Sequence, residues 1–211
     1  MINSVSGYHH HLRTNLTPMH SHLETAVDRI FDYLRACGSL IADRRRPGLN
    51  PAEVEAQIGA LGLRPPTDLV QLYAYCDGTT TTAGKDLLGK INFFPAFYWM
   101  NLDEAVTVYH SLSNYSSWRR SWLPIFANGG GDFYVVICET TSPFFGEVLL
   151  VMYDETDHIA EFQNVSAMFE TIERCFVEKA FFCSDGYLKA DYAKMSAIAH
   201  SVQPDFAEHD I

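Results

Sequence analysis

Short β-like segments joined by turns dominate the centre of this chain and most constrain its fold. Residues 133–138, 147–153 and 158–162 are apolar or alternating, rich in β-branched and aromatic residues, and separated by connections of hairpin length. Parallel strands would need a longer crossover segment between them. The sequence therefore predicts an antiparallel sheet here. Residues 91–99, which are aromatic, and 123–126 are predicted as further strands.

Helical patterns lie before and after these strands. Apolar residues at three- and four-residue spacing predict helices over 21–43, 51–60, 67–76, 102–112, 166–182 and 186–201. Ser21 with Glu24 forms a capping box for the first of them, and Asn50 precedes Pro51 at the start of the second. The order of helices, strands and helices predicts an α+β fold, with a mainly antiparallel sheet, flanking helices, and extra N- and C-terminal helices.

The chain is predicted to hold one main domain with additions at both ends. We expect a mobile tail at 1–19, a helical extension at 20–50, the α+β domain at 51–182, and a C-terminal helix and tail at 183–211. No apolar run approaches the roughly 18 residues of a membrane-spanning helix. The first residues lack the basic and apolar regions of a secretory signal. These observations predict a cytoplasmic protein without membrane association.

Five cysteines are scattered along the sequence, and no two form a Cys-x-x-Cys pair. They are Cys37, Cys76, Cys138, Cys175 and Cys183. Each lies among apolar neighbours, and in a reducing compartment such cysteines are usually small core residues. The sequence therefore predicts free, buried thiols in place of a disulfide framework or a zinc site.

Negative charge is concentrated in one part of the chain. The net charge is −11, and residues 132–178 hold ten acidic residues with Arg174 as the one Arg or Lys. Such a field repels nucleic acid and anionic membranes and favours a basic protein partner. The alternative is that these carboxylates serve solubility alone.

The search for catalytic or cofactor motifs gives little. Residues 78–86 resemble a phosphate loop, but Asp86 stands where Ser or Thr would hold magnesium, and a helix precedes the loop. The Gly-Gly-Gly-Asp run at 129–132 leads into a strand, so it is predicted as a tight turn. His20 and His22 lack a fixed third metal ligand. We predict no cofactor, no metal and no catalytic residue. An enzyme stays a third alternative, which a deep cavity with polar groups of shifted pKa would favour.

An ordered set of motifs resembles the SUKH superfamily over residues 51–180. These motifs are Leu-Arg-Pro-Pro-Thr-Asp-Leu at 63–69, Asp-Gly at 77–78, Phe-Phe-Pro at 93–95, Asn-Leu-Asp-Glu-Ala at 101–105, Trp-Leu-Pro-Ile-Phe-Ala at 122–127 with the glycine run, and Gly-Glu-Val at 146–148. The sequence departs from the pattern after Gly78, where a threonine run replaces the usual glycine, and in its additional terminal helices.

The resemblance implies a fold, a function and a partner. SUKH proteins have a curved β-sheet with flanking helices. Bacterial members are commonly immunity proteins that neutralise toxins, often nucleases, and fungal members regulate cell-wall synthesis. It therefore implies a non-catalytic immunity protein that binds a cognate, basic toxin. A regulatory or scaffold protein of the same fold is the alternative.

The acidic strands and a neighbouring loop are predicted to form the partner-binding site. Acidic side chains would face a basic cleft, and exposed aromatic residues would anchor the interface. The predicted contact residues are Glu139, Glu147, Asp154, Glu155, Asp157 and Glu161, with Phe144 and Phe145 as anchors. The identity of the toxin, the face that binds it and the oligomeric state stay open.

Overall fold

The computed structural model describes residues 21–81, 88–153 and 155–211. The predicted mobile tail at 1–19, most of the phosphate-loop-like segment and Asp154 lie outside these ranges. Within the described residues, no helix combines the length and the apolar character needed to span a bilayer.

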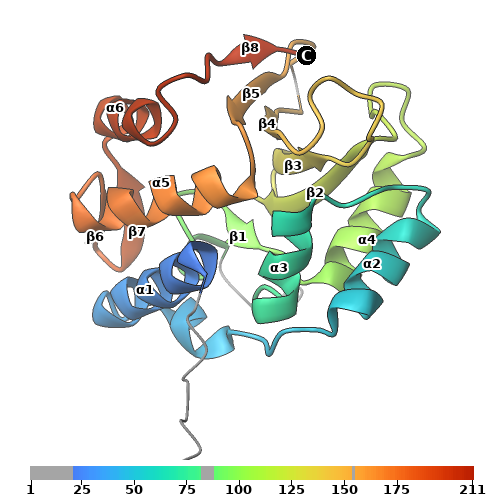
Figure 1. Cartoon of the computed structure of the whole chain (residues 1–211). Coiled ribbons are helices and arrows are strands. Elements are labelled where there is room, and N and C mark those ends of the chain that lie inside the picture. Colours follow the sequence, from blue (N-terminus) through green and yellow to red (C-terminus); the bar gives the residue numbers. More distant parts are fainter. Residues whose placement is uncertain (1–20, 82–87, 154) are drawn as a thin grey trace, which may run out of the picture.

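The chain begins with helices, continues with a run of short strands and ends with further helices and strands (Figure 1). The helices are α1 (His22–Ala36), η1 (Leu40–Arg44), α2 (Pro51–Ala60), α3 (Thr67–Tyr75), η2 (Leu88–Lys90), α4 (Leu102–Leu112), α5 (Val165–Val177) and α6 (Tyr192–Val202), where η marks a 3₁₀ helix. The strands are β1 (Tyr98–Trp99), β2 (Trp122–Ala127), β3 (Phe133–Ile137), β4 (Val148–Val151), β5 (Ile159–Phe162), β6 (Phe181–Ser184), β7 (Tyr187–Ala190) and β8 (His209–Asp210).

Six strands form one antiparallel sheet in the order β1-β2-β3-β4-β5-β8, and β6 pairs with β7 in a separate hairpin. The predicted α+β class and antiparallel pairing are confirmed. Figure 1 shows α1, α5 and α6 gathered at one side of the view and α2 and α4 at the other.

Helix starts follow the predicted capping chemistry. The Ser21 hydroxyl accepts from the backbone N–H of Glu24, whose carboxylate accepts from the N–H of Ser21. Asn50 caps α2 by a single bond, in which its side-chain oxygen accepts from the backbone N–H of Ala52. Such caps satisfy N–H groups that have no partner inside the helix, so they fix where each helix begins.

The main sheet packs apolar residues on both of its faces. The face that we call the α5 face carries Tyr134 and Val136, in one core with the helices α1, α3 and α5. The opposite face, here called the tail face, carries Val135 and Ile137, in a smaller core that the C-terminal residue Ile211 helps to cover. A sheet that is buried on both sides explains why β2 and β3 read as nearly continuous apolar runs.

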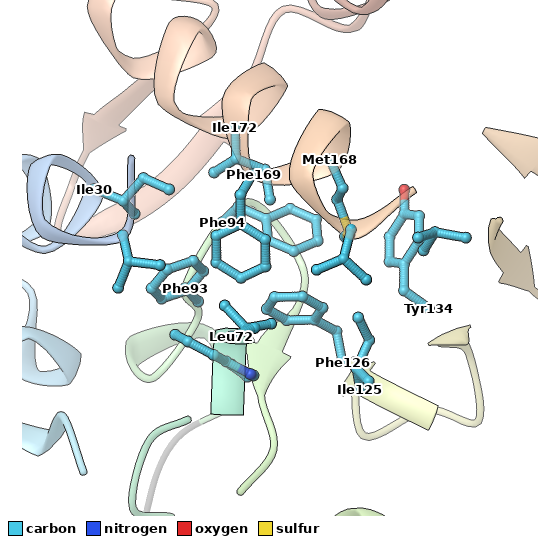
Figure 2. Packing of buried hydrophobic residues seen from close by; sticks show 14 of the residues in the cluster. Ile30, Leu72, Phe93, Phe94, Ile125, Phe126, Tyr134, Met168, Phe169 and Ile172 are labelled. Carbon is cyan, nitrogen blue, oxygen red and sulfur yellow. The ribbon is translucent and has the colours of Figure 1, made fainter. Parts of the chain in front are cut away.

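Aromatic rings fill the core under α5 (Figure 2). Phe93 lies within 6 Å of the rings of Trp99, Phe126 and Phe169, at centroid distances of 5.2, 5.9 and 5.9 Å. Edge-to-face and tilted pairs of this kind add to the stabilisation that burial alone provides. The packing holds the turn before β1 against α5.

The strand predicted over 91–99 and the helix predicted over 21–43 are each cut short by a turn of the backbone. Only Tyr98–Trp99 of the aromatic segment 91–99 is a strand, because the chain turns at 94–97, where Ala96 has φ 73°. The first helix ends at Ala36 and a 3₁₀ turn follows, since Gly38 takes a left-handed conformation with φ 66°. Glycine adopts that region without steric cost.

Two helix predictions are wrong where the β6–β7 hairpin lies: the helix predicted over 166–182 ends at Val177, and the helix predicted over 186–201 is wrong in its first part. Residues 181–190 form the β6–β7 hairpin, and α6 begins only at Tyr192, capped by Asp191. Asp185 and Gly186 have φ values of 55° and 75°, the conformation of a two-residue hairpin turn. An Asp-Gly pair between apolar residues is a strong hairpin signal, and here it overrides the helical spacing.

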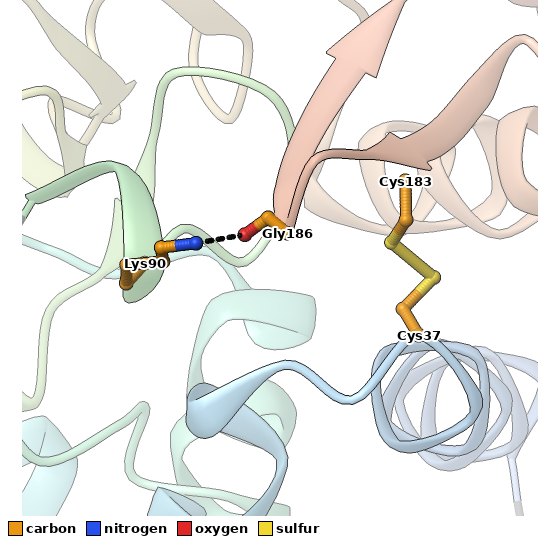
Figure 3. Close-up of a disulfide and its surroundings, with 4 residues drawn as sticks. All are labelled: Cys37, Lys90, Cys183 and Gly186. Carbon is orange, nitrogen blue, oxygen red and sulfur yellow. Dashed lines mark hydrogen bonds between the residues drawn. A yellow bond between two sulfur atoms is a disulfide. The ribbon is translucent and has the colours of Figure 1, made fainter.

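Two cysteines are bonded, which corrects the prediction that all five are free. Cys37 after α1 and Cys183 on β6 form a disulfide with Cα atoms 6.0 Å apart (Figure 3). The other three, Cys76, Cys138 and Cys175, are free and buried as predicted. Nearby, Lys90 Nζ donates to the carbonyl oxygen of Gly186 at 2.9 Å.

Polar contacts also fix α1 against α5. Arg29 Nη1 lies 2.7 Å from Glu173 Oε1, and the Glu173 side chain is only 7% exposed. The carboxylate raises the pKa of Arg29 through this hydrogen bond. Tyr33 stacks on Phe176 at 5.9 Å. The helix that precedes the SUKH-like motifs is therefore part of the folded body.

Candidate functional site

A groove of about 240 Å³ opens on the tail face beside the β4–β5 loop. Trp118, from the segment after α4, lines it together with Phe133 of β3 and His158 before β5. Trp118 packs edge-on against Phe133 at 5.9 Å, and this contact joins the α4 connection to the sheet. The groove is thus built where three separate segments meet.

Two tyrosines stand at the rim of this groove. Tyr115 is 64% exposed and Tyr153 is 77% exposed, and both line the groove. Exposed aromatic side chains beside a groove are typical anchors of protein interfaces, because they bury a large area at little cost in conformational entropy. We name this surface the aromatic groove.

Acidic residues of the β4–β5 loop border the aromatic groove. Glu155 lines it, and Asp157 is exposed on the same loop. Asp154, the third predicted acid of this turn, lies outside the described residues. The predicted hairpin between β4 and β5 is confirmed. It places these carboxylates at one end of the sheet, next to Tyr153.

Tyr153 is held by the glycine-rich turn between β2 and β3. The Asp132 carboxylate accepts from the backbone N–H of Tyr153 at 3.0 Å. Gly131 has φ 112°, and a Cβ atom there would lie 3.1 Å from Cβ of Tyr153. The Gly-Gly-Gly-Asp run is the tight turn that the sequence predicts. Its Asp132 carboxylate and the close approach of Gly131 hold the exposed Tyr153 in place.

Two residues that line the aromatic groove carry buried nitrogen atoms with unused hydrogen-bonding capacity. Within the described part of the chain, neither Trp118 Nε1 nor His158 Nδ1 has a hydrogen-bond partner. Burial lowers the pKa of His158, and Arg119 lowers it further, which favours the neutral imidazole. Buried polar atoms without partners are uncommon in native proteins.

The predicted anchors Phe144 and Phe145 separate in the structure. Phe144 is half-buried and packs on the tail-face core, with its ring 4.9 Å from that of His209. Phe145 is 37% exposed. Glu147, on the same connection, lies 3.1 Å from His209 Nε2 and is 16% exposed. Burial raises the pKa of Glu147, and His209 opposes that shift. Phe144 and Glu147 therefore dock β8.

Glu139 lines a cavity of about 600 Å³. This cavity lies between the α2–α3 turn, α4 and the segment after β3, and its lining includes Arg64 and Arg120. Glu139 is exposed and accepts from the Thr141 hydroxyl at 3.1 Å. Its surroundings are mixed in charge, unlike those of the β4–β5 loop.

Glu161 lies on the α5 face, away from the other predicted acids. A β-bulge explains its direction: Val148 pairs with Phe162 and Leu149 with Ala160, so Glu161 is the extra residue of β5. Its Oε2 accepts from the Tyr134 hydroxyl at 2.7 Å. Burial raises the pKa of Glu161 to about 7.

The structure thus divides the predicted site residues. Glu155 and Asp157 lie together on one exposed loop, Glu139 and Phe145 lie elsewhere on the surface, and Glu147 and Glu161 face inward. The sequence analysis missed Tyr115, Trp118 and Tyr153, although three aromatic residues close to turns were a usable signal. No group of three or more His, Cys, Asp or Glu gathers as a metal site in the described residues.

The architecture defines a class of protein: an α+β domain whose antiparallel sheet carries helices on its faces and an exposed aromatic groove at one end. The model of the SMI1 / KNR4 family (SUKH-1) matches residues 48–172, more than half of the chain, and the chain belongs to this family. No curated protein matches it. The matched segment includes β1 to β5 and most of α5, whereas α1, the β6–β7 hairpin and α6 lie outside it.

Proposed function

We propose that this protein is an immunity protein, which binds a cognate toxin with a basic active-site cleft, such as a nuclease, and so blocks its activity. The observation that carries the proposal is the aromatic groove with its acidic loop. There, Tyr115 and Tyr153 are strongly exposed beside Glu155 and Asp157. Membership of a family that includes immunity proteins supports it.

The groove suits inhibition by binding. The tyrosines would supply the buried anchor of the interface, while the carboxylates at the rim would attract a basic surface and speed association. An antidote of this kind performs no chemical step, so we propose that the protein is not an enzyme. The proposed partner is a protein, not nucleic acid or membrane, and the proposed place of action is the cytoplasm.

A growth experiment tests this proposal. The protein is co-expressed with the toxin encoded beside its gene, and growth is compared with that of cells expressing the toxin alone. We expect the wild-type protein to restore growth and to co-purify with the toxin. The double variant Glu155→Lys/Asp157→Lys, which reverses the charge of the loop, should restore growth poorly.

Asp43→Lys is the matched control. Asp43 is exposed on η1, far along the chain from the acidic loop, so this variant makes the same type of charge change on another surface. It should protect cells as the wild type does. Failure of the wild-type protein to form a complex with the neighbouring toxin would contradict the proposal.

A regulatory or scaffold protein of the same fold is the second candidate. It is favoured by the elements outside the family match, because α1 and α6 offer further surfaces that could dock partners. A gene located away from any toxin, together with several co-purifying host proteins that do not depend on the aromatic groove, would support this candidate over the first.

A further inference from the structure

A further cavity, of about 290 Å³, lies on the α5 face of the sheet. It is enclosed by the turn at 94–97, the strands β3 to β5, the strand β6 and the start of α6. Phe181, Tyr192 and Met195 in its wall lie beyond residue 172, where the family match ends. The cavity is therefore completed by elements that this chain adds to the family domain.

Five aromatic residues line this cavity. Phe97 stacks on Phe94 at 5.4 Å and lies 4.8 Å from Tyr134 in an edge-on arrangement. Phe181 also stacks on Phe94, at 6.3 Å. Tyr192, which is 69% exposed, stands at the rim. Figure 2 shows Tyr134 at the edge of the labelled cluster, on the side away from α1.

Glu161 brings a carboxylate into this aromatic wall. Its Oε2 accepts from the Tyr134 hydroxyl, and no side chain in the described part of the chain donates to Oε1. No Lys, Arg or His of the described ranges lies within 4 Å of the carboxylate. Glu161 is partly exposed in this cavity, so its carboxylate is open to a cation that enters from outside.

We propose that this cavity binds the cationic head group of an arginine or lysine side chain presented by a protein partner. Ring faces attract a guanidinium or an ammonium through the aromatic quadrupole, and the attraction grows when the cation is removed from water. Oε1 of Glu161 supplies the opposite charge. Met195 and Leu150 offer apolar contact for the methylene stem of the bound side chain.

The lining favours binding over catalysis. No Ser, Thr, Cys, His or Lys is among its described residues, and the Tyr134 hydroxyl is held by its hydrogen bond to Glu161. The Asp132 carboxylate is already engaged by Asn128 Nδ2 at 2.5 Å and by the N–H of Tyr153. Glu161 is thus the carboxylate with an unused oxygen.

Binding of a cation requires the ionised form of Glu161. The pKa of this carboxyl is raised to about 7, because burial and the charge of Glu208 raise it more than the Tyr134 hydrogen bond lowers it. The other titratable groups that face the site are Asp132 of the β2–β3 turn and Tyr192 of α6. Affinity for a cation should therefore increase as the pH rises through neutrality.

Methionine methyl NMR provides the test. Met195 lines the cavity, while Met100 is fully buried in a different cluster and serves as an internal reference. The full-length protein with ¹³C-labelled methionine methyls is titrated with N-acetyl-arginine methylamide, N-acetyl-lysine methylamide and neutral N-acetyl-norleucine methylamide at constant ionic strength. We expect the Met195 signal to shift with the two cationic probes and not with norleucine, and Met100 to stay unchanged.

Variants separate charge from fold. Glu161→Gln keeps the shape and an acceptor for Tyr134, and it should weaken binding of the cationic probes by about tenfold or more. Glu139→Gln removes one carboxylate outside the cavity and should leave binding unchanged. For the wild type, binding should be stronger at about pH 8 than at about pH 6.

Three results would overturn the proposal: no Met195 shift with either cation, equal shifts with norleucine, or unchanged binding in Glu161→Gln. A shift caused by tetramethylammonium alone, without arginine or lysine, would assign the cavity to a free alkylammonium ligand and would also reject a protein side chain. Because the probes are small molecules and no toxin is used, the outcome does not depend on the proposed immunity function.

Discussion

Gln203 Nε2 donates a hydrogen bond to the backbone carbonyl oxygen of Glu161 at 2.6 Å. The Oε1 atom of the same side chain accepts from the backbone N–H of Gln163 at 3.0 Å. Gln203, at the end of α6, is 4% exposed. One buried amide therefore satisfies the backbone on both sides of Phe162, where the bulge interrupts the regular ladder of β5.

Replacing Gln203 by leucine should destabilise the fold. The variant leaves one backbone C=O and one N–H buried without partners, and each such group costs about 1–3 kcal/mol. We expect the free energy of unfolding to fall by about 2–4 kcal/mol in denaturant titrations. Gln163→Leu, which alters an exposed side chain nearby, should change it by about 0.5 kcal/mol or less. Equal effects of the two variants would contradict the role given to Gln203.

Tyr153→Ala should weaken toxin binding if the aromatic groove is the interface. Truncation of an anchoring aromatic residue costs about 2 kcal/mol or more, which raises the dissociation constant about 30-fold. Calorimetry with the purified toxin measures this. Tyr187→Ala removes a 42% exposed tyrosine from the β6–β7 hairpin and should bind as the wild type does. A stronger loss in Tyr187→Ala would move the interface to the hairpin.

Asp77→Ala should be one of the most destabilising single substitutions. Asp77 is 2% exposed, and its carboxylate accepts from Arg46 Nε and from the backbone N–H of Leu102, both at 2.8 Å. Removing one partner of a buried pair costs about 3–5 kcal/mol. Thermal unfolding of Asp32→Ala gives the comparison, since Asp32 pairs with Arg35 on the surface. That variant should lose about 0–0.5 kcal/mol.

Reduction of the Cys37–Cys183 bond should lower stability. The two cysteines are 146 positions apart, and closing such a long loop restricts the unfolded chain by up to about 5 kcal/mol. Unfolding with and without dithiothreitol measures the difference. The double variant Cys37→Ser/Cys183→Ser should show the lower stability under both conditions. A dithiothreitol effect that persists in the double variant would have another cause.

The same bond bears on the predicted cytoplasmic location. Disulfides persist mainly in oxidising compartments, while the cytosol keeps thiols reduced. Thiol labelling of the protein taken directly from cells therefore distinguishes the two environments. Labelling at Cys37 and Cys183 is expected for the cytoplasm, and protection of both is expected for an oxidising compartment.

Glu161 should make stability fall as the pH rises from mildly acidic to neutral. Its pKa is about 7 in the folded protein, against an ordinary value of 4.5, so the folded state binds more protons than the unfolded state between these values. The stabilisation is complete below the unfolded pKa and is lost as the pH passes the folded pKa. The total is about 3 kcal/mol. In Glu161→Gln, urea unfolding should show a smaller loss of unfolding free energy over the same pH range, and the difference from the wild type should be about 3 kcal/mol.

Local chemistry explains which parts of the fold were predictable. Ser21 with Glu24, and Asn50 before Pro51, use hydrogen-bonding partners within a few residues, so the sequence shows the helix starts directly. The β4–β5 hairpin was predictable for the same reason. The Asp-Gly pair at 185–186 carried an equally local signal, but the apolar spacing that follows it resembles a helix.

The candidate site was harder to predict because it depends on contacts between distant segments. The direction of Glu161 is set by a bulge, which a strict alternation of inward and outward residues does not reveal. Glu147 faces inward because His209, 62 positions later, returns to the sheet as part of β8. Charge density alone could locate the acidic segment but could not show which carboxylates reach the surface.

The disulfide also changes the covalent topology of the molecule. The backbone from Cys37 to Cys183, closed by the sulfur–sulfur bond, is a ring that contains the whole matched segment 48–172. A single backbone cleavage anywhere inside this ring leaves all fragments covalently joined. A nicked protein would therefore run as one species in a non-reducing gel and separate into two pieces only after reduction.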